Sequence, residues 1–326
     1  MPIDECGVTI MQIEKNSSSL PSFSLSALLI ACFLVPWVAG CSFAAIPISP
    51  PETVGVQSIR LSSGEPIYYR KAGEHGAATP ILLIHGIPDS SESWVPIMEQ
   101  LSKTHSVYAV DLAGYGYSEW SDNHNFSLSA QADYLREFME RLGLKQAVLV
   151  GHDIGGGIAQ ILTVRQPQRI THLVLVNSAM ADKWPAFEVR MLRTPFIGIA
   201  TFTVLENPIW SYMLRIGFAD KEKITPEVRQ KYQRWFQGTD GRKRLVRNAR
   251  ALDNTDLTKL DRDVVKLPMP TLILWGRQDR FLPASPAQGA CVQMPNCRFQ
   301  YIEQAGHFVL DEKPNEIADY ILRFIQ

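Results

Sequence analysis

The stretch Val148-Leu-Val-Gly-His-Asp-Ile-Gly-Gly-Gly157 places one acidic side chain, Asp153, between an apolar run and a glycine-rich segment. The apolar run predicts a buried strand, and residues 155–164 show a helical pattern. Small flanking residues allow a sharp strand-to-helix turn that directs the side chain at its tip outward. An aspartate at this place can also cap the helix. The glycine pattern, with the two partners described below, favours Asp153 as a catalytic nucleophile.

The rest of the chain alternates between apolar runs and helical patterns. The predicted strands cover 56–62, 66–71, 80–85, 106–111, 146–151, 170–176, 270–275 and 297–302. The predicted helices cover 94–101, 129–142, 155–164, 285–294 and 314–324. Such alternation predicts an α/β fold with a mainly parallel sheet that helices cover on both faces.

This alternation stops between residues 179 and 262, where the sequence is aromatic and helix-like and shows no buried strand. We expect this segment to form a helical cap, inserted after the sixth strand, over the carboxyl edge of the strands. Ligands bind at that edge in sheets of this kind. The core is then predicted at 56–178 and 263–326, and residues 41–55 are predicted to be a linker.

Residues 1–40 contain an apolar run that is too short for an ordinary membrane span, is interrupted by Pro36 and ends in small residues. They predict an export signal or a membrane anchor. The sequence Val38-Ala-Gly-Cys41 resembles the lipobox of bacterial lipoproteins, which implies a lipid on Cys41. A plain secretory signal and an uncleaved anchor remain alternatives. We therefore expect an exported protein, either periplasmic or held at a membrane as a lipoprotein.

The chain has 326 residues, of which 46% are hydrophobic, and a formal net charge of -1. This balance is typical of a soluble globular protein and predicts no nucleic-acid partner. The basic stretch 241–250 is interpreted as a solvated helix face rather than a polyanion site. The cysteine spacing is not that of a zinc site, so we predict no metal or cofactor. The oligomeric state is not predicted.

Only Cys291 and Cys297, of the five cysteines, lie in the predicted globular part. If the protein is exported, these two can close a small loop as a disulfide. The alternative is a pair of buried thiols that pack as small hydrophobic residues. The sequence leaves both possibilities open.

Two further groups follow Asp153 in an order that suits catalysis. Asp279 comes after the predicted strand 270–275, and His307 comes after the strand 297–302. Nucleophile, acid and histidine is the order expected of a triad on a sheet of this kind. Glu303 and the position of Asn177 are alternative places for the acid. Because Asn177 has no carboxylate, Asp279 is favoured.

The motifs His85-Gly-Ile-Pro88 with Trp94, Asp111-Leu-Ala-Gly-Tyr-Gly116 and Gly151-His-Asp-Ile-Gly155 resemble the epoxide hydrolase and haloalkane dehalogenase branch of the α/β-hydrolases. The resemblance extends from about Ser58 to the C-terminus and includes the surroundings of Asp279 and His307. It implies an oxyanion site made by the backbone N–H groups of Ile87 and Ile154. The predicted partners are a small hydrophobic substrate and water.

An aspartate nucleophile limits the reactions that the enzyme can catalyse. A carboxyl group with a pKa near ~4 is already ionised at neutral pH, and its attack on a saturated carbon gives an alkyl ester. His307 would then deprotonate the water that cleaves this ester, with Asp279 orienting the imidazole. Epoxides and alkyl halides are suitable substrates. A carboxylic-ester or carbon–carbon bond hydrolase is a further alternative, and a binding protein that has lost turnover is another.

The resemblance favours epoxides by elimination. Haloalkane dehalogenases carry a Trp directly after the nucleophile and often an Asn in the loop that includes Ile87; here both positions are isoleucine. Haloacetate dehalogenases carry an Arg where Ile154 stands. Epoxide hydrolases use a cap tyrosine as proton donor, and the stretch 248–252 has none. The candidate substrate-binding residues are therefore Tyr212 and Tyr232, together with Trp94. Three cap tryptophans are weighed as pocket-lining or packing residues: Trp184, Trp210 and Trp235.

Overall fold

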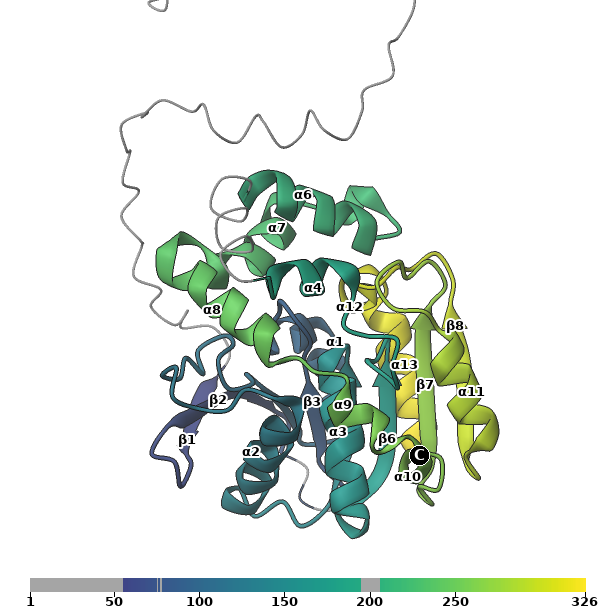
Figure 1. Cartoon of the computed structure of the whole chain (residues 1–326). Coiled ribbons are helices and arrows are strands. Elements are labelled where there is room, and N and C mark those ends of the chain that lie inside the picture. The colour runs from purple at the N-terminus through teal and green to yellow at the C-terminus, as the bar shows by residue number, and fades with distance from the viewer. Residues whose placement is uncertain (1–54, 75, 77, 195–205) are drawn as a thin grey trace, which may run out of the picture. The chain divides into compact units, whose positions relative to one another are not determined.

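The computed structural model describes residues 55–74, 76, 78–194 and 206–326 (Figure 1). The predicted export segment and Cys41 lie outside these residues. The chain divides into the units Met1–Pro47 and Ile48–Gln326, and every described residue belongs to the second. None of the helices in these described ranges is long and apolar enough to span a membrane.

An eight-stranded sheet forms the centre of the second unit, in the order β1-β2-β4-β3-β5-β6-β7-β8. The strands are β1 (Val56–Arg60), β2 (Pro66–Ala72), β3 (Ile81–Ile84), β4 (Val107–Val110), β5 (Ala147–His152), β6 (Ile170–Val176), β7 (Thr271–Gly276) and β8 (Cys297–Ile302). β2 runs antiparallel to β1 and β4, and all other neighbouring strands are parallel. The mainly parallel α/β sheet predicted from the sequence is confirmed, with strand ends displaced by at most two residues.

The continuous apolar runs arise because both faces of the sheet are buried. In β3, Ile81 and Leu83 belong to one core cluster, whereas Leu82 and Ile84 belong to the other. Successive side chains of a strand point to opposite faces, so a strand covered on both sides needs an apolar residue at every position. The first cluster includes residues of α1 (Val95–Leu101) and α13 (Pro314–Ile325). The second includes residues of α2 (Leu128–Arg141), α3 (Ile154–Arg165) and α11 (Ser285–Gln293).

Within the described residues, the segment between β6 and β7 consists of helices joined by turns and contains no strand. Its helices are α4 (Phe187–Leu192), α6 (Glu206–Gly217), α7 (Pro226–Gln233), α8 (Gly238–Ala251), α9 (Thr255–Thr258) and α10 (Asp261–Val264). Figure 1 shows α4, α6, α7 and α8 gathered over one end of the sheet. These helices occupy the position of the predicted cap, and α10 runs past the predicted boundary at residue 262.

Two features that the sequence left open can be seen in the described residues. The basic stretch 241–250 lies on α8, and three of its arginines make ion pairs: Arg242–Glu206, Arg244–Glu119 and Arg247–Asp122. These three arginine side chains are mostly buried and paired with carboxylates, so this part of the helix is packed rather than solvated as predicted. A disulfide joins Cys291 on α11 to Cys297 on β8, with 5.3 Å between their Cα atoms.

Candidate active site

The turn between β5 and α3 holds Asp153 in a backbone conformation that L-residues rarely adopt. Its φ is 51° and its ψ is -121°. The neighbouring glycines are required by close packing. A Cβ on Gly155 would lie 2.3 Å from the carbonyl oxygen of Ile84, and one on Gly156 would lie 2.1 Å from Oγ of Ser178. Strained conformations that the surrounding structure enforces in this way occur at functional sites.

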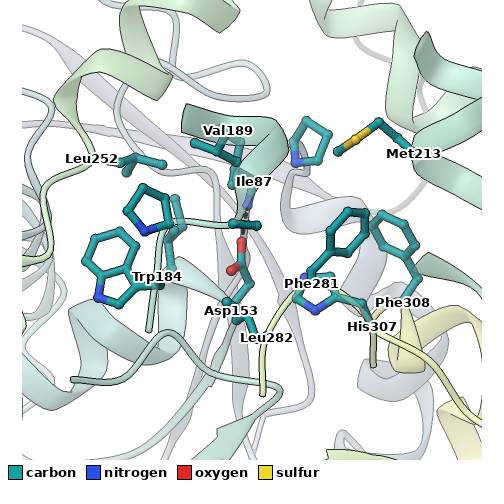
Figure 2. A pocket seen from close by; sticks show the side chains of 14 residues that line it. Ile87, Asp153, Trp184, Val189, Met213, Leu252, Phe281, Leu282, His307 and Phe308 are labelled. Carbon is teal, nitrogen blue, oxygen red and sulfur yellow. Dashed lines mark hydrogen bonds between the residues drawn. The ribbon is translucent and has the colours of Figure 1, made fainter. Parts of the chain in front are cut away.

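The carboxylate of Asp153 contacts both predicted oxyanion donors. Its Oδ2 accepts the backbone N–H of Ile87 at 3.0 Å, and the backbone N–H of Ile154 also hydrogen-bonds to the carboxylate. Figure 2 shows the Asp153 carboxylate directed toward Ile87. Gly86 allows this approach, because a Cβ there would lie 2.5 Å from Cβ of Asp153. One carboxylate oxygen therefore already occupies the position that an oxyanion would take.

His307 and Asp279 are in direct contact. Nδ1 of His307 lies 2.9 Å from Oδ2 of Asp279, and both side chains are almost completely buried. The other oxygen of Asp279 accepts the backbone N–H groups of Phe281 and Leu282 at 2.8 and 3.0 Å. A carboxylate fixed in this way orients the imidazole and stabilises its charged form. The structure thus brings Asp279, His307 and Asp153 to one site.

Asn177 and Glu303, the alternative places for the acid, have other roles. Nδ2 of Asn177 donates to Oδ2 of Asp279 at 2.7 Å, and its Oδ1 accepts the N–H of Gly276 at 3.0 Å. Asn177 therefore holds Asp279 in place, a role that was not predicted. Glu303 is exposed and pairs with Arg277 at 2.7 Å, away from the imidazole.

The charges of the three groups shift one another's pKa values. Burial lowers the pKa of His307, but the carboxylates of Asp279 and Asp153 outweigh burial and raise it from its ordinary 6.5. Burial raises the pKa of Asp279, but His307 outweighs burial and the pKa is lowered. For Asp153 burial prevails, so its pKa is raised although His307 and the two amides act against the shift. Burial disfavours the charged form of Asp153, and the opposing contacts reduce but do not reverse this shift.

Asp153 and His307 face an otherwise apolar pocket (Figure 2). Its lining residues are Ile87, Pro88, Asp153, Ile154, Trp184, Pro185, Ala186, Val189, Met213, Leu252, Phe281, Leu282, His307 and Phe308. The space between these side chains is about 30 Å³, which is small for a sizeable substrate. In the described ranges no three His, Cys, Asp or Glu side chains are grouped to hold a metal.

The three predicted substrate-binding residues are not among the residues that line this pocket, and their role in substrate binding stays a prediction. Trp94 is fully buried in the core cluster that includes α1 and α13. Tyr232 is buried, and its hydroxyl donates to Oδ2 of Asp311 at 2.5 Å. Tyr212 is 54% exposed, with its hydroxyl 3.4 Å from Glu188. Aromatic character in a helical segment does not reveal whether a side chain packs, faces solvent or lines a cavity.

Other lining residues were missed or left undecided by the sequence. Phe281 follows Asp279 by two positions, and Phe308 follows His307 directly, so their closeness to the triad was a usable signal. Met213, on α6, carried no such signal. Of the three cap tryptophans weighed as pocket residues, Trp184 lines the pocket, whereas Trp210 and Trp235 are buried elsewhere. Nε1 of Trp184 is buried and has no hydrogen-bond acceptor among the described residues.

Known proteins resemble this chain over most of its length. The 2-hydroxymuconate semialdehyde hydrolase of Pseudomonas sp. (strain CF600) is 26% identical over 77% of this chain and 88% of its own length. Epoxide hydrolase 4 of Homo sapiens is 24% identical over 81% of this chain and 76% of its own. The solved haloalkane dehalogenase of Bradyrhizobium elkani superposes with a TM-score of 0.73 at 23% identity, covering 83% of this chain and 97% of that one. Residues 79–314 match the family described as "alpha/beta hydrolase fold". Because this match covers well over half of the sequence, the chain belongs to the alpha/beta hydrolase fold family.

Proposed function

We propose that this hydrolase uses Asp153 as its nucleophile and opens hydrophobic epoxides through a covalent alkyl ester. The observation that carries the proposal is the environment of the carboxylate. Oδ2 of Asp153 accepts the N–H of Ile87, and His307, supported by Asp279, faces the same pocket. With Oδ2 held by the Ile87 amide, Oδ1 is the attacking atom. Attack on a saturated carbon gives an ester that water can cleave, whereas attack on an acyl carbon gives a reactive anhydride.

In the first step, Oδ1 of Asp153 forms a bond to an epoxide carbon and the ring C–O bond breaks. The ring oxygen takes a proton from water, since Tyr212 and Tyr232 lie away from the pocket. Because the Asp153 ester is uncharged, its formation removes one of the negative charges that raise the pKa of His307. The imidazole is then more readily neutral at the stage that needs a base.

In the second step, His307 takes a proton from a water molecule whose oxygen attacks the carbonyl carbon of the ester. The N–H groups of Ile87 and Ile154 stabilise the oxyanion. The bond between the carbonyl carbon and Oδ1 then breaks, and the leaving alkoxide takes the proton back from His307. The new carboxyl group loses its proton to the hydroxide left by the first step. Asp153 retains one oxygen from water, and the diol carries the original Oδ1.

The choice of an epoxide rests on the residues beside the nucleophile. The side chains of Ile87 and Ile154 have no N–H group with which to bind a departing halide. The lining side chains are apolar apart from Asp153 and His307, which suits a hydrophobic substrate. The similarity to human epoxide hydrolase 4 points in the same direction.

Haloalkane dehalogenation is the second candidate, and Trp184 is the observation that favours it. This side chain lines the pocket, and its buried Nε1–H has no acceptor among the described residues. A buried donor without a partner is costly, and a halide leaving group would provide one. The same alkyl ester would form, with the halide replacing the epoxide oxygen as leaving group.

A single turnover in oxygen-18 water tests the nucleophile. Excess enzyme is mixed with an aryl epoxide, and the peptide that contains Asp153 and the diol are analysed by mass spectrometry. We expect one labelled oxygen in Asp153 and none in the first diol formed. His307→Gln should retain the alkyl ester, whereas Glu303→Gln, whose side chain is exposed and paired with Arg277, should behave as the unaltered protein. Label in the diol but not in Asp153 would mean that water attacks the epoxide directly, and it would overturn the role of Asp153 as nucleophile.

Product analysis with a panel of epoxides and bromoalkanes tests the substrate. We expect diols from the epoxides and little bromide from the bromoalkanes. Trp184→Phe keeps an aromatic ring but removes the N–H group, so it should slow bromide release much more than diol formation. Bromide release that exceeds diol formation and depends on Trp184 would establish the second candidate instead.

We also propose that the protein is exported, with a lipid on Cys41, which lies outside the described residues. The disulfide between Cys291 and Cys297 supports export, because disulfides persist in oxidising compartments. Labelling cells with a radioactive fatty acid should mark the unaltered protein but not a Cys41→Ser variant. Equal labelling of both would exclude Cys41, and secretion of an unlabelled protein would favour a plain signal.

A further inference from the structure

Glu312, the last residue of α12 (Val309–Glu312), is a buried carboxylate outside the triad. Only 1% of the residue is exposed, and no salt bridge to it is found among the described residues. Its Oε2 accepts the N–H of Gly306 at 2.6 Å, and its Oε1 accepts the N–H groups of Ala219 and Asp220 at 2.7 and 2.8 Å. Hydrogen bonds of this kind offset the cost of burying the charge, and Lys221 nearby also favours the charged form.

The three amides belong to two parts of the molecule. Gly306 directly precedes His307, whereas Ala219 and Asp220 follow α6 in the cap. The two parts also touch directly, since the backbone N–H of His307 donates to the carbonyl oxygen of Gly217 at 2.7 Å. A Cβ on Gly306 would lie 2.2 Å from that same oxygen. The loop of His307 is therefore held against the end of α6, and Glu312 bridges the contact.

This arrangement needs a carboxylate. A glutamine at position 312 would have the same size, but its NH₂ group would face one set of backbone N–H donors. Those donors would lose their acceptor while remaining buried. Both oxygens of Glu312 are thus required, one for the His307 loop and one for the cap. A side chain that only filled space would not have this requirement.

We propose that Glu312 is a positioning residue that ties the His307 loop to the cap and keeps the imidazole within reach of the water that attacks Asp153. This inference rests on the proposed function. Glu312 touches neither the substrate pocket nor the triad side chains. Ester formation needs Asp153, whereas ester hydrolysis needs the base, so loss of the tie should slow the second step selectively. A displacement of about 1 Å in a reacting group can cost on the order of 100-fold in rate.

Asp311 supplies the matched control. It lies on the same helix and also binds the cap, through Lys231 at 2.6 Å and the hydroxyl of Tyr232, but among the described residues its carboxylate accepts no hydrogen bond from the His307 loop. Asp311→Asn therefore weakens the attachment of the cap without releasing Gly306. Glu312→Gln releases one side of the bridge at constant size.

The experiment separates the two steps with an aryl epoxide. For Glu312→Gln we expect kcat to fall about 10- to 100-fold while the single-turnover rate of ester formation is unchanged, so that the Asp153 ester accumulates. For Asp311→Asn we expect no accumulation. Equal slowing of both steps in Glu312→Gln, or equal accumulation in Asp311→Asn, would overturn the inference. If Glu312→Gln does not fold, Glu312→Asp, which keeps the charge but shortens the reach, should show the same selective slowing to a smaller degree.

A spectroscopic measurement is independent of the chemistry at Asp153. The Nδ1 proton between His307 and Asp279 can be followed by proton NMR, and its signal should shift in Glu312→Gln but not in Asp311→Asn. A signal that does not move in Glu312→Gln would overturn the positioning role. The His307→Gln variant distinguishes the two proposals. If this variant retains no Asp153 ester, the proposed function fails. The NMR result then decides the role of Glu312 by itself.

Discussion

The turn at Asp153 and the loop at His307 face the same pocket, but different kinds of contact hold them. Asp153 stands between one strand and one helix, with its own glycine neighbours packed against the backbone of β3. His307 depends on groups far along the chain. Its ring contacts Asp279, its N–H donates to Gly217 in the cap, and its carbonyl oxygen accepts Nε2–H of His152 at 2.9 Å.

This difference separates the two chemical steps physically. The proposed nucleophile is held by β3, by the end of β6 and by the residues that directly follow β6, so we expect movements of the cap helices to affect its geometry less than that of the base. The base is held jointly by the core and the cap, because Glu312 and Gly217 connect its loop to the residues after α6. We therefore expect changes at the turn to abolish ester formation, and changes around the His307 loop to slow ester hydrolysis.

Removal of the proposed nucleophile should have the largest effect. Asp153→Ala is expected to lower kcat/KM by about 10⁴- to 10⁶-fold, the range for loss of a nucleophile that acts together with its partners. Thermal unfolding would verify that the variant folds. Substantial turnover in the folded variant would show that the turn does not carry the nucleophile. The assignment of ester formation to the turn and of ester hydrolysis to the His307 loop would then be wrong.

Asp279→Asn tests the support of the base. The amide removes the charge that stabilises the imidazolium and can reverse the tautomer, so we expect kcat to fall by on the order of 10⁴-fold. Ester formation in a single turnover should be much less affected. Asn177→Ala, which removes one hydrogen bond to Asp279, should show the same pattern with a far smaller loss. A loss confined to ester formation would contradict the division of steps.

Two glycines, one beside Asp153 and one beside the His307 loop, allow the two regions to be compared by the same substitution. Gly155→Ala would bring a Cβ to 2.3 Å from a backbone oxygen at the turn, and Gly276→Ala would bring one to 2.1 Å from the carbonyl oxygen of Gly306 beside His307. Each should lower the free energy of unfolding by about 1–3 kcal/mol, measured by denaturant titration. Gly289, on α11, has open space around its missing Cβ, and Gly289→Ala should not destabilise the protein.

These variants should also differ in kinetics. Gly155→Ala should form the ester slowly, whereas Gly276→Ala should form it normally and accumulate it. The two rates can be measured in one rapid-quench experiment. If both variants fail at the same step, the turn and the loop are not mechanically separate.

The pH dependence reports on His307. The base must be neutral, and its pKa is raised from 6.5, so kcat should fall about tenfold per pH unit below the pKa that His307 has in the ester. That pKa should be lower than in the free enzyme, because the ester removes the charge of Asp153. The stability of the folded state depends on pH in the opposite direction. The raised pKa stabilises the folded state fully below pH 6.5, and this contribution is lost as the pH rises through the folded value.

The smallest effect on catalysis is expected far from both regions. Replacing Cys291 and Cys297 by serine opens a short loop, which should lower the free energy of unfolding by about 2 kcal/mol without changing kcat. Denaturant titration and steady-state kinetics would verify both. A large change in kcat would mean that the edge of the sheet at β8 influences the His307 loop that follows it.

The sequence by itself determined the features that repeat or that act over a few residues. Alternating apolar runs predicted the sheet because strands buried on both faces need continuous apolar residues. The glycines around Asp153 identified the turn, because close backbone packing can be read from the neighbours alone. Asp279 and His307 were identified by their positions after strands whose ends meet at one edge of the sheet.

Only the tertiary structure decided which side chains gather around these groups. Trp94, Tyr212 and Tyr232 were predicted near the substrate. In the structure, Trp94 lies in the core, Tyr212 lies on the surface, and the hydroxyl of Tyr232 is hydrogen-bonded to Asp311. The support of Asp279 by Asn177 and the bridge made by Glu312 join residues separated by about one hundred positions. Such contacts depend on how helices pack after the chain has turned back on itself, and no local pattern encodes that arrangement.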